Sequence, residues 1–384
     1  MENSHTNPLS IVLAGGGTAG HISPMLAIAD ALKADDAATQ VTVVGTPSGM
    51  ETRIVPLAGY ELKTINRVPM PRRPSADLFK FPSRFRAAIR QAGEILDAAN
   101  ADVAVGVGGY VCTPVYLAAR RRRIPVVLHE ANAKAGLANK VGARFAARVA
   151  AAFPGTGLER VEIVGMPMKS AIATLDRKGA QEAAREFFGL DPQRPTIVVT
   201  GGSLGAASLN QTIKAVLPKL PASDLQILHI TGKDKALLNA DGSLLNHPGY
   251  VQTEFVDGMD KAYAAADLFI SRSGAGTVCE LAAVGVPAIL VPLPIGNGEQ
   301  KLNARPLVEA GGAHMVDDAG FTPEWFMSTV VPLALNPQRL DAMSQASLRV
   351  GKRDAAQVMS RLIREEAFTH RAADAGDSSP AKEE

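Results

Sequence analysis

The sequence contains few of the residues that mark small secreted proteins. Its 384 residues include only two cysteines, Cys112 and Cys279, which lie far apart and fit neither a disulfide framework nor a metal-binding pair. We therefore expect a reducing compartment. Aromatic residues are also scarce, at 5%, whereas glycine and alanine are plentiful, which favours close packing of helices on a sheet.

An excess of one charge and a long unbroken apolar run are missing as well. The 40 Lys and Arg residues against 38 Asp and Glu residues leave a net charge of +2, which gives no global signal for nucleic acid. Glycines and a proline interrupt the most apolar stretch, 101–119, so we expect a strand, a loop and a helix start there instead of a membrane span. The first eight residues lack a signal-peptide pattern, and any membrane role should be peripheral.

Two halves of the chain repeat one pattern of strand, glycine loop and helix. The first half has a strand at 10–14, a glycine loop at 15–20 and a helix at 24–34. The second half restarts with a strand at 196–200 and a glycine loop at 201–205. Further apolar runs predict strands at 41–44, 103–107, 125–128, 149–152, 162–164, 226–231, 250–253, 268–271 and 288–291. This alternation predicts an α/β fold of two Rossmann-like domains with parallel sheets.

The repeat also predicts where the domains begin and end. We expect an N-terminal domain at 1–166 and a C-terminal domain at 167–352, joined by a hinge near 165–169. A last helix at about 353–368 should pack back on the first domain. The polar tail at 369–384 is predicted to be disordered.

The first glycine loop reads Gly-Gly-Gly-Thr-Ala-Gly and ends next to His21. The second predicted strand carries no carboxylate at its end, which argues against a nicotinamide enzyme. Backbone N–H groups of such a loop can instead bind an anion beside a helix N-terminus. The His21 imidazole could remove a proton from a hydroxyl, or it could cap the helix or bind substrate.

The second half contains a matching loop and a carboxylate on the helix that follows a later strand. Ser203 lies in the glycine loop and offers a hydroxyl donor. Glu280 follows a turn of small residues, where a carboxylate can accept both ribose hydroxyls of a nucleotide. Glu299, Gln300 and Asn303 supply groups suited to sugar hydroxyls.

Polar residues also follow strands of the first half. Tyr110 comes after two glycines at a strand end, and the segment from His129 to Asn139 comes after the next strand. The carboxyl ends of parallel strands are where such sheets bind ligands. These segments should therefore lie at the same edge as His21.

A basic and aromatic segment at 67–90 separates two of these strands. Its cations alternate with apolar side chains, which suits an anionic membrane surface, although a nucleic acid or a solvated loop would fit the same composition. The candidate membrane patch comprises Arg72, Arg73, Leu78, Phe79, Lys80, Phe81 and Arg84. The sequence contains no Asp-x-Asp triplet, and no essential metal or cofactor is expected.

Taken together, these motifs resemble the peptidoglycan enzyme family that adds N-acetylglucosamine to undecaprenyl-diphospho-muramoylpentapeptide, converting lipid I to lipid II. The resemblance spans nearly the whole chain in the expected order. It rests on 16–21 with Pro24, 108–110, 129–139, 201–210, 271–280 and 292–303. It implies a GT-B fold and an inverting, metal-independent transfer from UDP-N-acetylglucosamine.

The resemblance also implies roles for individual residues. His21 is the first candidate for the catalytic base, and Glu130 is the second. Gly17, Tyr110, Asn132 and Asn139 would bind the acceptor. The residues implied for the donor are Thr18, Ala19, Gly20, Lys169, Ser203, Gly205, Glu280 and Gln300.

The same resemblance implies partners and a location. They are UDP-N-acetylglucosamine, lipid I, the anionic cytoplasmic face of the cell membrane, and cell-wall and division proteins, without nucleic acid. This chain departs from the family pattern at Ala19, Ala131, Lys169, Leu204 and Glu299. A transferase for another lipid or a small natural product, a UDP-sugar epimerase and a non-catalytic nucleotide-binding protein stay open as alternatives.

Overall fold

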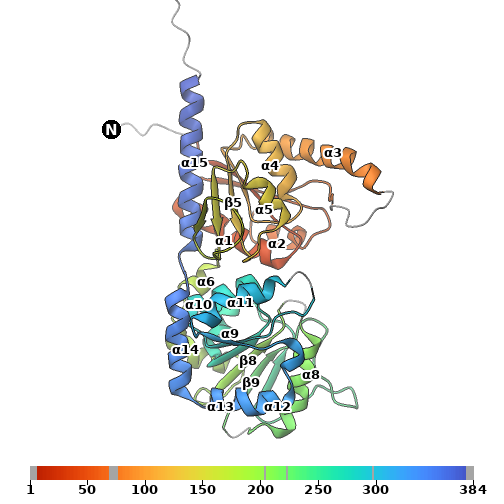
Figure 1. Ribbon diagram of the computed structural model, residues 1–384, viewed down its shortest axis with the longest axis vertical. Coiled ribbons are helices and arrows are strands. Elements are labelled where there is room, and N and C mark those ends of the chain that lie inside the picture. Colours follow the sequence, from red (N-terminus) through yellow and green to blue (C-terminus); the bar gives the residue numbers. More distant parts are fainter. Residues whose placement is uncertain (1–6, 69–76, 203–204, 222–223, 296–297, 378–384) are drawn as a thin grey trace, which may run out of the picture. The chain divides into compact units, whose positions relative to one another are not determined.

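Two compact units make up the protein, which is described here by a computed structural model (Figure 1). The first unit comprises Met1–Lys169 and Asp354–Glu384, and the second comprises Ser170–Arg353. The structure describes residues 7–68, 77–202, 205–221, 224–295 and 298–377, with the side chains at 77–79 and 374–377 outside that description.

The first unit is built on a parallel sheet of seven strands in the order β3-β2-β1-β4-β5-β6-β7. The strands are β1 (Ser10–Ala14), β2 (Gln40–Gly45), β3 (Glu61–Thr64), β4 (Val103–Gly106), β5 (Val126–Glu130), β6 (Arg148–Ala151) and β7 (Val161–Ile163). The first six follow the Rossmann order, as the sequence predicts. The edge strand β3 is the one strand of this sheet missing from the sequence-based prediction.

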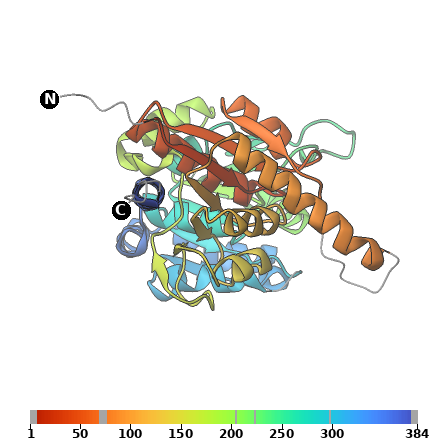
Figure 2. The ribbon, with the colours of Figure 1, turned by 90° about the horizontal axis from the view of Figure 1, so that it is seen from above.

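Helices cover both faces of this sheet because successive side chains of a buried strand point to opposite sides. Ile11 and Leu13 of β1 pack in one apolar cluster with the first and last helices of the unit, whereas Val12 and Ala14 pack in another with α3 and α4. Figure 2 shows α3 beside α4, in agreement with their contacts. The helices are α1 (Ala19–Asp35), α2 (Glu51–Leu57), α3 (Asp77–Ala98), α4 (Cys112–Arg121), α5 (Leu137–Gly142) and α15 (Ala355–Asp377).

The last helix corrects the prediction of a disordered tail from residue 369. α15 continues to Asp377 and packs against α1. Arg371 donates to both carboxylate oxygens of Asp102, at 2.6 and 2.7 Å, and also to the backbone carbonyls of Asn7 and Pro8. These bonds hold residues of the predicted tail on the first unit.

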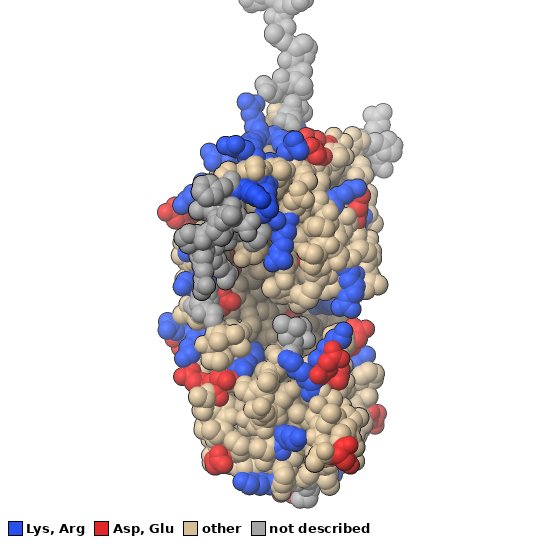
Figure 3. Space-filling model, turned by 90° about the vertical axis from the view of Figure 1, so that its right-hand side faces the viewer, with Lys and Arg blue, Asp and Glu red and all other residues tan. Residues whose placement is uncertain are grey.

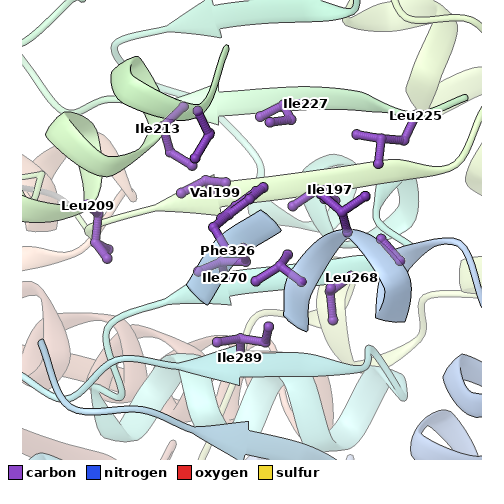
Figure 4. Packing of buried hydrophobic residues seen from close by; sticks show 14 of the residues in the cluster. Ile197, Val199, Leu209, Ile213, Leu225, Ile227, Leu268, Ile270, Ile289 and Phe326 are labelled. Carbon is purple, nitrogen blue, oxygen red and sulfur yellow. The ribbon is translucent and has the colours of Figure 1, made fainter. Parts of the chain in front are cut away.

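The second unit repeats the plan with six parallel strands in the order β10-β9-β8-β11-β12-β13. Figure 4 shows Ile197, Val199 and Ile270 of the sheet packed against Leu209 and Phe326. The strands are β8 (Thr196–Thr200), β9 (Gln226–Ile230), β10 (Tyr250–Thr253), β11 (Leu268–Ser271), β12 (Ala288–Leu290) and β13 (Ala313–Met315).

Helices α8, α9, α10 and α11 follow strands of this sheet, and further helices precede and follow the sheet in the chain. The elements are α6 (Ser170–Ala173), α7 (Arg177–Phe187), α8 (Ala207–Val216), η1 (Leu217–Lys219), α9 (Met259–Ala265), α10 (Ala275–Val284), α11 (Glu299–Glu309), η2 (Asp318–Gly320), α12 (Pro323–Trp325), η3 (Phe326–Val330), α13 (Val331–Ala334) and α14 (Pro337–Val350). Both predicted Rossmann-like folds are therefore present.

Strand order places a ligand-binding position in each unit. In a Rossmann sheet, ligands bind at the carboxyl ends of the strands where the order reverses. That point lies between β1 and β4 in the first unit and between β8 and β11 in the second. The loops after these four strands are the motifs singled out from the sequence.

Candidate functional site

The glycine loop after β1 meets the Gly-Gly-Tyr turn after β4. A Cβ atom added to Gly109 would lie 2.7 Å from the carbonyl oxygen of Gly16, so only glycine allows this approach. Gly109 also has a φ of 94°, a backbone conformation that side chains disfavour. The two loops therefore form one continuous surface at the reversal of strand order.

His21 lies between these two loops. Its Nδ1 atom is 3.1 Å from the carbonyl oxygen of Gly16 and 3.3 Å from the hydroxyl of Thr18, the N-cap of α1. A Cβ atom built on Gly108 would lie 3.0 Å from His21 Nε2. His21 is half-buried, so part of the residue is exposed to solvent.

Gly17, Thr18 and Gly20 of the first loop are exposed, but one of the loop's N–H groups is occupied. Gly17 donates its N–H to Oε2 of Glu51, at 3.2 Å, so this amide already binds an anion of the protein itself. Ala19 and Gly20 begin α1, and the first N–H groups of a helix have no intrahelical acceptor. An external anion would therefore meet the amides from residue 18 onward.

Glu130, the second candidate for the base, is buried and fully engaged. Its Oε1 atom accepts the N–H of Asn132 at 2.9 Å, and its Oε2 atom accepts the N–H of Gly136 and the Nδ2 of Asn139, both at 3.0 Å. These bonds give the carboxylate a clear role in ordering the loop after β5.

Asn139 belongs to the same buried network. Its Nδ2 atom also donates to the carbonyl of His129 at 3.1 Å, and its Oδ1 atom accepts the phenol of Tyr116 at 2.8 Å. The side chain is buried, so its contacts lie within the protein. Asn132 is half-buried, and Tyr110 is exposed at 48%, which places both within reach of a ligand.

Lys169, a further residue predicted to bind the donor, lies at the end of the first unit. It is exposed and occupies the last position before the second unit.

In the second unit, the glycine loop after β8 is supported by a buried polar network. A Cβ atom on Gly205 would lie 2.3 Å from the carbonyl oxygen of Thr231, which also accepts Nδ2 of Asn210 at 3.0 Å. Oδ1 of Asn210 lies 3.0 Å from Nε2 of His229, whose Nδ1 is 3.0 Å from the Tyr250 hydroxyl. Ser203 and Leu204 lie outside the described residues.

The turn between β11 and α10 carries unpaired buried hydroxyls. Ser271 and Ser273 are at most 1% exposed, and their Oγ atoms have no hydrogen-bond partner among the described residues. Buried hydroxyls are normally paired, so a ligand with acceptor atoms fits this position. The N–H groups at the start of α10 add donors and positive potential, which favours a phosphate.

Arg272, in the same turn, connects the segments around this position. Its guanidinium donates to Oγ of Ser208 on α8 at 2.8 Å and to the carbonyl of Val291 at 3.1 Å, and it pairs with Asp318. Its side chain is only 10% exposed. We expect it to hold the loops of the second unit in register, a role that the sequence analysis missed.

Glu280 lies on α10, beyond this turn, and is held by a tyrosine. The phenol of Tyr263 on α9 donates to Oε2 of Glu280 at 2.6 Å. Burial, followed by the charge of Glu280 and this bond, raises the pKa of Tyr263 well above its ordinary value, so the phenol stays a donor. The residue is half-buried, and the bond from Tyr263 fixes the orientation of its carboxylate.

Gln300 and Glu299 begin α11, which follows β12. Oε1 of Gln300 accepts the N–H of Leu293 at 2.9 Å. The amide nitrogen of Gln300, at the start of α11, is therefore the group that can donate to a sugar oxygen. Gly298, before the helix, has a φ of 76°, which favours glycine.

The described part of the predicted membrane patch lies on α3. Lys80 and Arg84 are exposed, and Phe81 is half-buried and stacks on Phe85 with ring centroids 5.4 Å apart. Arg72 and Arg73 lie outside the described residues, as do the side chains of Leu78 and Phe79. The view of the side that carries α3 shows Lys and Arg side chains gathered on the upper part of the first unit (Figure 3).

The described residues provide neither a membrane-spanning helix nor a metal-binding cluster. No helix of the described chain combines the length and the apolar character needed to cross a lipid bilayer. The same residues contain no cluster of three or more His, Cys, Asp or Glu side chains arranged to hold a metal ion.

Two Rossmann-like units, each with ligand-binding loops where the strand order reverses, define a glycosyltransferase fold of the GT-B type. Residues 11–151 match the N-terminal domain of glycosyltransferase family 28, and residues 196–359 match its C-terminal domain. The chain belongs to this family.

Two relatives that match nearly the whole chain carry the name UDP-N-acetylglucosamine--N-acetylmuramyl-(pentapeptide) pyrophosphoryl-undecaprenol N-acetylglucosamine transferase. The protein from Paenarthrobacter aurescens (strain TC1) is 61% identical over 360 residues, 94% of this chain and 97% of the relative. The protein from Streptomyces coelicolor is 50% identical over 93% of this chain and 98% of its own length.

Solved structures give the same result for the fold. The crystal structure of Acinetobacter baumannii MurG is 30% identical, with a TM-score of 0.75, and the match covers 93% of this chain and all of that one. A UDP-GlcNAc 2-epimerase from Neisseria meningitidis, at 15% identity and a TM-score of 0.61, shares the fold alone.

Proposed function

We propose that the protein transfers N-acetylglucosamine from UDP-N-acetylglucosamine to the C4 hydroxyl of undecaprenyl-diphospho-N-acetylmuramoyl-pentapeptide, which converts lipid I to lipid II for peptidoglycan synthesis. The name shared by its relatives and their identity over nearly the whole chain support this reaction. The observation that carries the donor assignment is the α10 region, where unpaired buried hydroxyls precede a helix N-terminus and an oriented carboxylate.

The second unit would hold the donor. The diphosphate would bind Ser271, Ser273 and the first amides of α10, together with the glycine loop of Ser203 and Gly205. The ribose hydroxyls would donate to Glu280, and Gln300 would bind the sugar. Fixed donors that face the diphosphate stabilise the charge that develops on the leaving UDP.

The first unit would hold the acceptor and remove its proton. The C4 oxygen attacks the anomeric carbon of the donor while the bond from that carbon to the phosphate oxygen breaks, and the configuration inverts. The hydroxyl proton passes to Nε2 of His21, and UDP leaves with the bonding electron pair. Gly17, Tyr110 and Asn132 would contact the acceptor, whereas the bonds of Glu130 and Asn139 favour a supporting role.

Contacts of the first loop with the donor would come from Thr18, Ala19 and Gly20. Their amides begin α1 and suit a negatively charged group. Lys169 would add a cation to the donor, in place of the arginine that the family often has.

The acceptor is a membrane lipid, so the enzyme would act at the cytoplasmic face of the cell membrane. α3 supports this location because its exposed Lys80 and Arg84 suit anionic headgroups and Phe81 suits the interface. Bound peripherally at this membrane, the enzyme would take part in cell-wall growth and, through it, in cell shape and division.

A direct assay tests the reaction. The purified protein is incubated with labelled UDP-N-acetylglucosamine and a water-soluble lipid I analogue, and the products are separated. A disaccharide formed only when both substrates are present supports the proposal. Free sugar and UDP formed without any need for the acceptor would contradict it and would favour an epimerase.

A further inference from the structure

Glu51, the first residue of α2, is a buried carboxylate next to the first glycine loop. Its residue exposure is 0%, and an unpaired charge at such depth would be strongly unfavourable. Oε1 accepts the N–H of Thr46 at 2.9 Å and its hydroxyl at 2.8 Å, and Oε2 accepts the N–H of Gly17 at 3.2 Å. Burial acts to raise the pKa of Glu51, but these bonds outweigh it and lower the pKa, so the side chain is ionised.

Glycines surround this carboxylate. A Cβ atom on Gly16 would lie 2.7 Å from Oε1, one on Gly45 would lie 2.5 Å from Cγ, and one on Gly49 would lie 2.1 Å from Oε2. Each of these positions brings backbone against Glu51: the first glycine loop, the end of β2 and the turn before α2. The loop is therefore packed around the carboxylate, which explains a requirement for glycine at positions without a positive φ.

One peptide group connects Glu51 to His21. The N–H of Gly17 and the C=O of Gly16 belong to the same planar trans peptide, so they point in opposite directions. The N–H points to Glu51 and the C=O points to Nδ1 of His21, at 3.1 Å. The carboxylate therefore sets the orientation of the carbonyl that faces the imidazole.

The carbonyl in turn selects the histidine tautomer. A carbonyl oxygen can only accept, so its bond with Nδ1 requires the proton on Nδ1 and leaves a lone pair on Nε2. Nε2 is the nitrogen that faces Gly108 in the turn after β4. The imidazole thus presents its basic nitrogen at the reversal of strand order, where the acceptor would lie.

We propose that Glu51 is a positioning residue that acts through the Gly16–Gly17 peptide to hold His21 with Nδ1 protonated and Nε2 ready to accept a proton. This inference rests on the proposed function in one respect, the role of His21 as the base. Glu51 itself touches no substrate in this account.

Replacement of Glu51 by glutamine tests the inference. The amide keeps the size of the side chain, but its NH2 group cannot accept a hydrogen bond, so either Gly17 or Thr46 loses an acceptor. We expect kcat to fall roughly 10- to 100-fold, by analogy with residues that orient metal-binding histidines, whose removal has effects of that size. The affinity for UDP should stay within about twofold of the wild type, since the ribose and most of the proposed diphosphate contacts belong to the second unit.

Nitrogen NMR of histidine-labelled protein provides a readout that a loss of stability alone would not change. The His21 signals are assigned by their absence in His21→Ala. In the wild type the ring should show a protonated Nδ1 and an unprotonated Nε2 at a pH where the ring is neutral. In Glu51→Gln the population should shift toward the other tautomer.

Two further variants keep the test decisive. Glu61→Gln changes an exposed glutamate at the sheet edge of the same unit and should leave both readouts unchanged. Thr46→Val removes one hydrogen bond to Glu51 and should shift both readouts in the same direction by a smaller amount, and it decides the matter if Glu51→Gln does not fold.

The outcomes separate this inference from the proposed function. A folded Glu51→Gln protein, or failing that a folded Thr46→Val protein, with wild-type kcat and wild-type His21 tautomer would overturn the role of Glu51. If His21→Ala kept full activity, the base assignment would fail instead, and the tautomer shift would still report whether Glu51 orients the ring.

Discussion

We predict that Glu280, oriented by its contact with Tyr263, binds the ribose of the nucleotide. Two conservative substitutions test this prediction. Glu280→Gln removes the charge that would strengthen the bonds from the ribose hydroxyls. Hydrogen bonds to charged groups contribute about 1.5–3 kcal/mol, so UDP should bind about 10- to 150-fold more weakly. Tyr263→Phe leaves the carboxylate but removes the 2.6 Å bond that orients it. We expect a loss of about 1 kcal/mol, or roughly fivefold in affinity.

Titration calorimetry with UDP and 2′-deoxy-UDP measures both effects. The wild type should prefer UDP because the 2′-hydroxyl donates to Glu280, and this preference should shrink in both variants. Tyr60→Phe is the matched control, since it removes a phenol that donates to a carboxylate, Asp30, at the same distance of 2.6 Å but in the first unit. If Glu280→Gln bound UDP and 2′-deoxy-UDP as the wild type does, the ribose assignment would be refuted. An effect of Glu280→Gln without any effect of Tyr263→Phe would refute only the orienting role of the tyrosine.

Three other predictions concern the base, the membrane and pH. His21→Ala should lower kcat by roughly 10²- to 10⁴-fold with UDP affinity preserved, and a loss smaller than about tenfold would remove His21 from proton transfer. The triple variant Lys80→Ser, Phe81→Ser, Arg84→Ser should sediment less with anionic vesicles and should keep its activity on a water-soluble acceptor. Its vesicle partition coefficient should fall roughly 30-fold, since two cations are lost at about 1 kcal/mol each. Unchanged sedimentation would contradict the membrane role of α3. Burial lowers the pKa of His129 to about 4 and that of His229 to about 3, so both are neutral when folded and take up protons on unfolding. The stability that each histidine contributes is complete above the ordinary pKa of 6.5 and is lost as the pH falls toward these values. The free energy of unfolding, measured by urea titration, should therefore fall by up to about 1.4 kcal/mol per pH unit for each histidine between pH 6.5 and 4. A free energy that stays constant over this range would contradict the prediction.

Buried strands were predictable from the sequence because both faces of a parallel sheet are covered. β1 and β8 begin and end at the predicted residues, 10–14 and 196–200, since each is a continuous apolar run next to glycines. β3 and β13 were missed because they are edge strands of four and three residues with exposed positions, which gives them no apolar run. α1 begins at Ala19 and not at the predicted Pro24, because proline favours the first turn of a helix and drew the predicted start too late.

The motifs of the site were predictable as loops, but their internal partners were not. Glu51 contacts Gly17 across 34 positions of sequence, and Tyr263 contacts Glu280 across 17, so neither pairing forms a local pattern. Without the fold, nothing in the sequence next to Glu51 or Tyr263 marks either residue as a partner of the site. The sequence offered Glu130 as the second candidate for the base because it does not show the three bonds that Glu130 makes to the loop after β5. These bonds depend on the folded backbone.

The central claim is that the second unit binds the nucleotide at α10, where it presents a diphosphate to serine hydroxyls and a ribose to a carboxylate. A crystal structure of the protein grown with UDP tests this most directly. We expect diphosphate oxygens within hydrogen-bond distance of Ser273 or the first amides of α10, with the ribose against Glu280. Electron density for UDP at the first glycine loop, beside His21, with α10 unoccupied would contradict it.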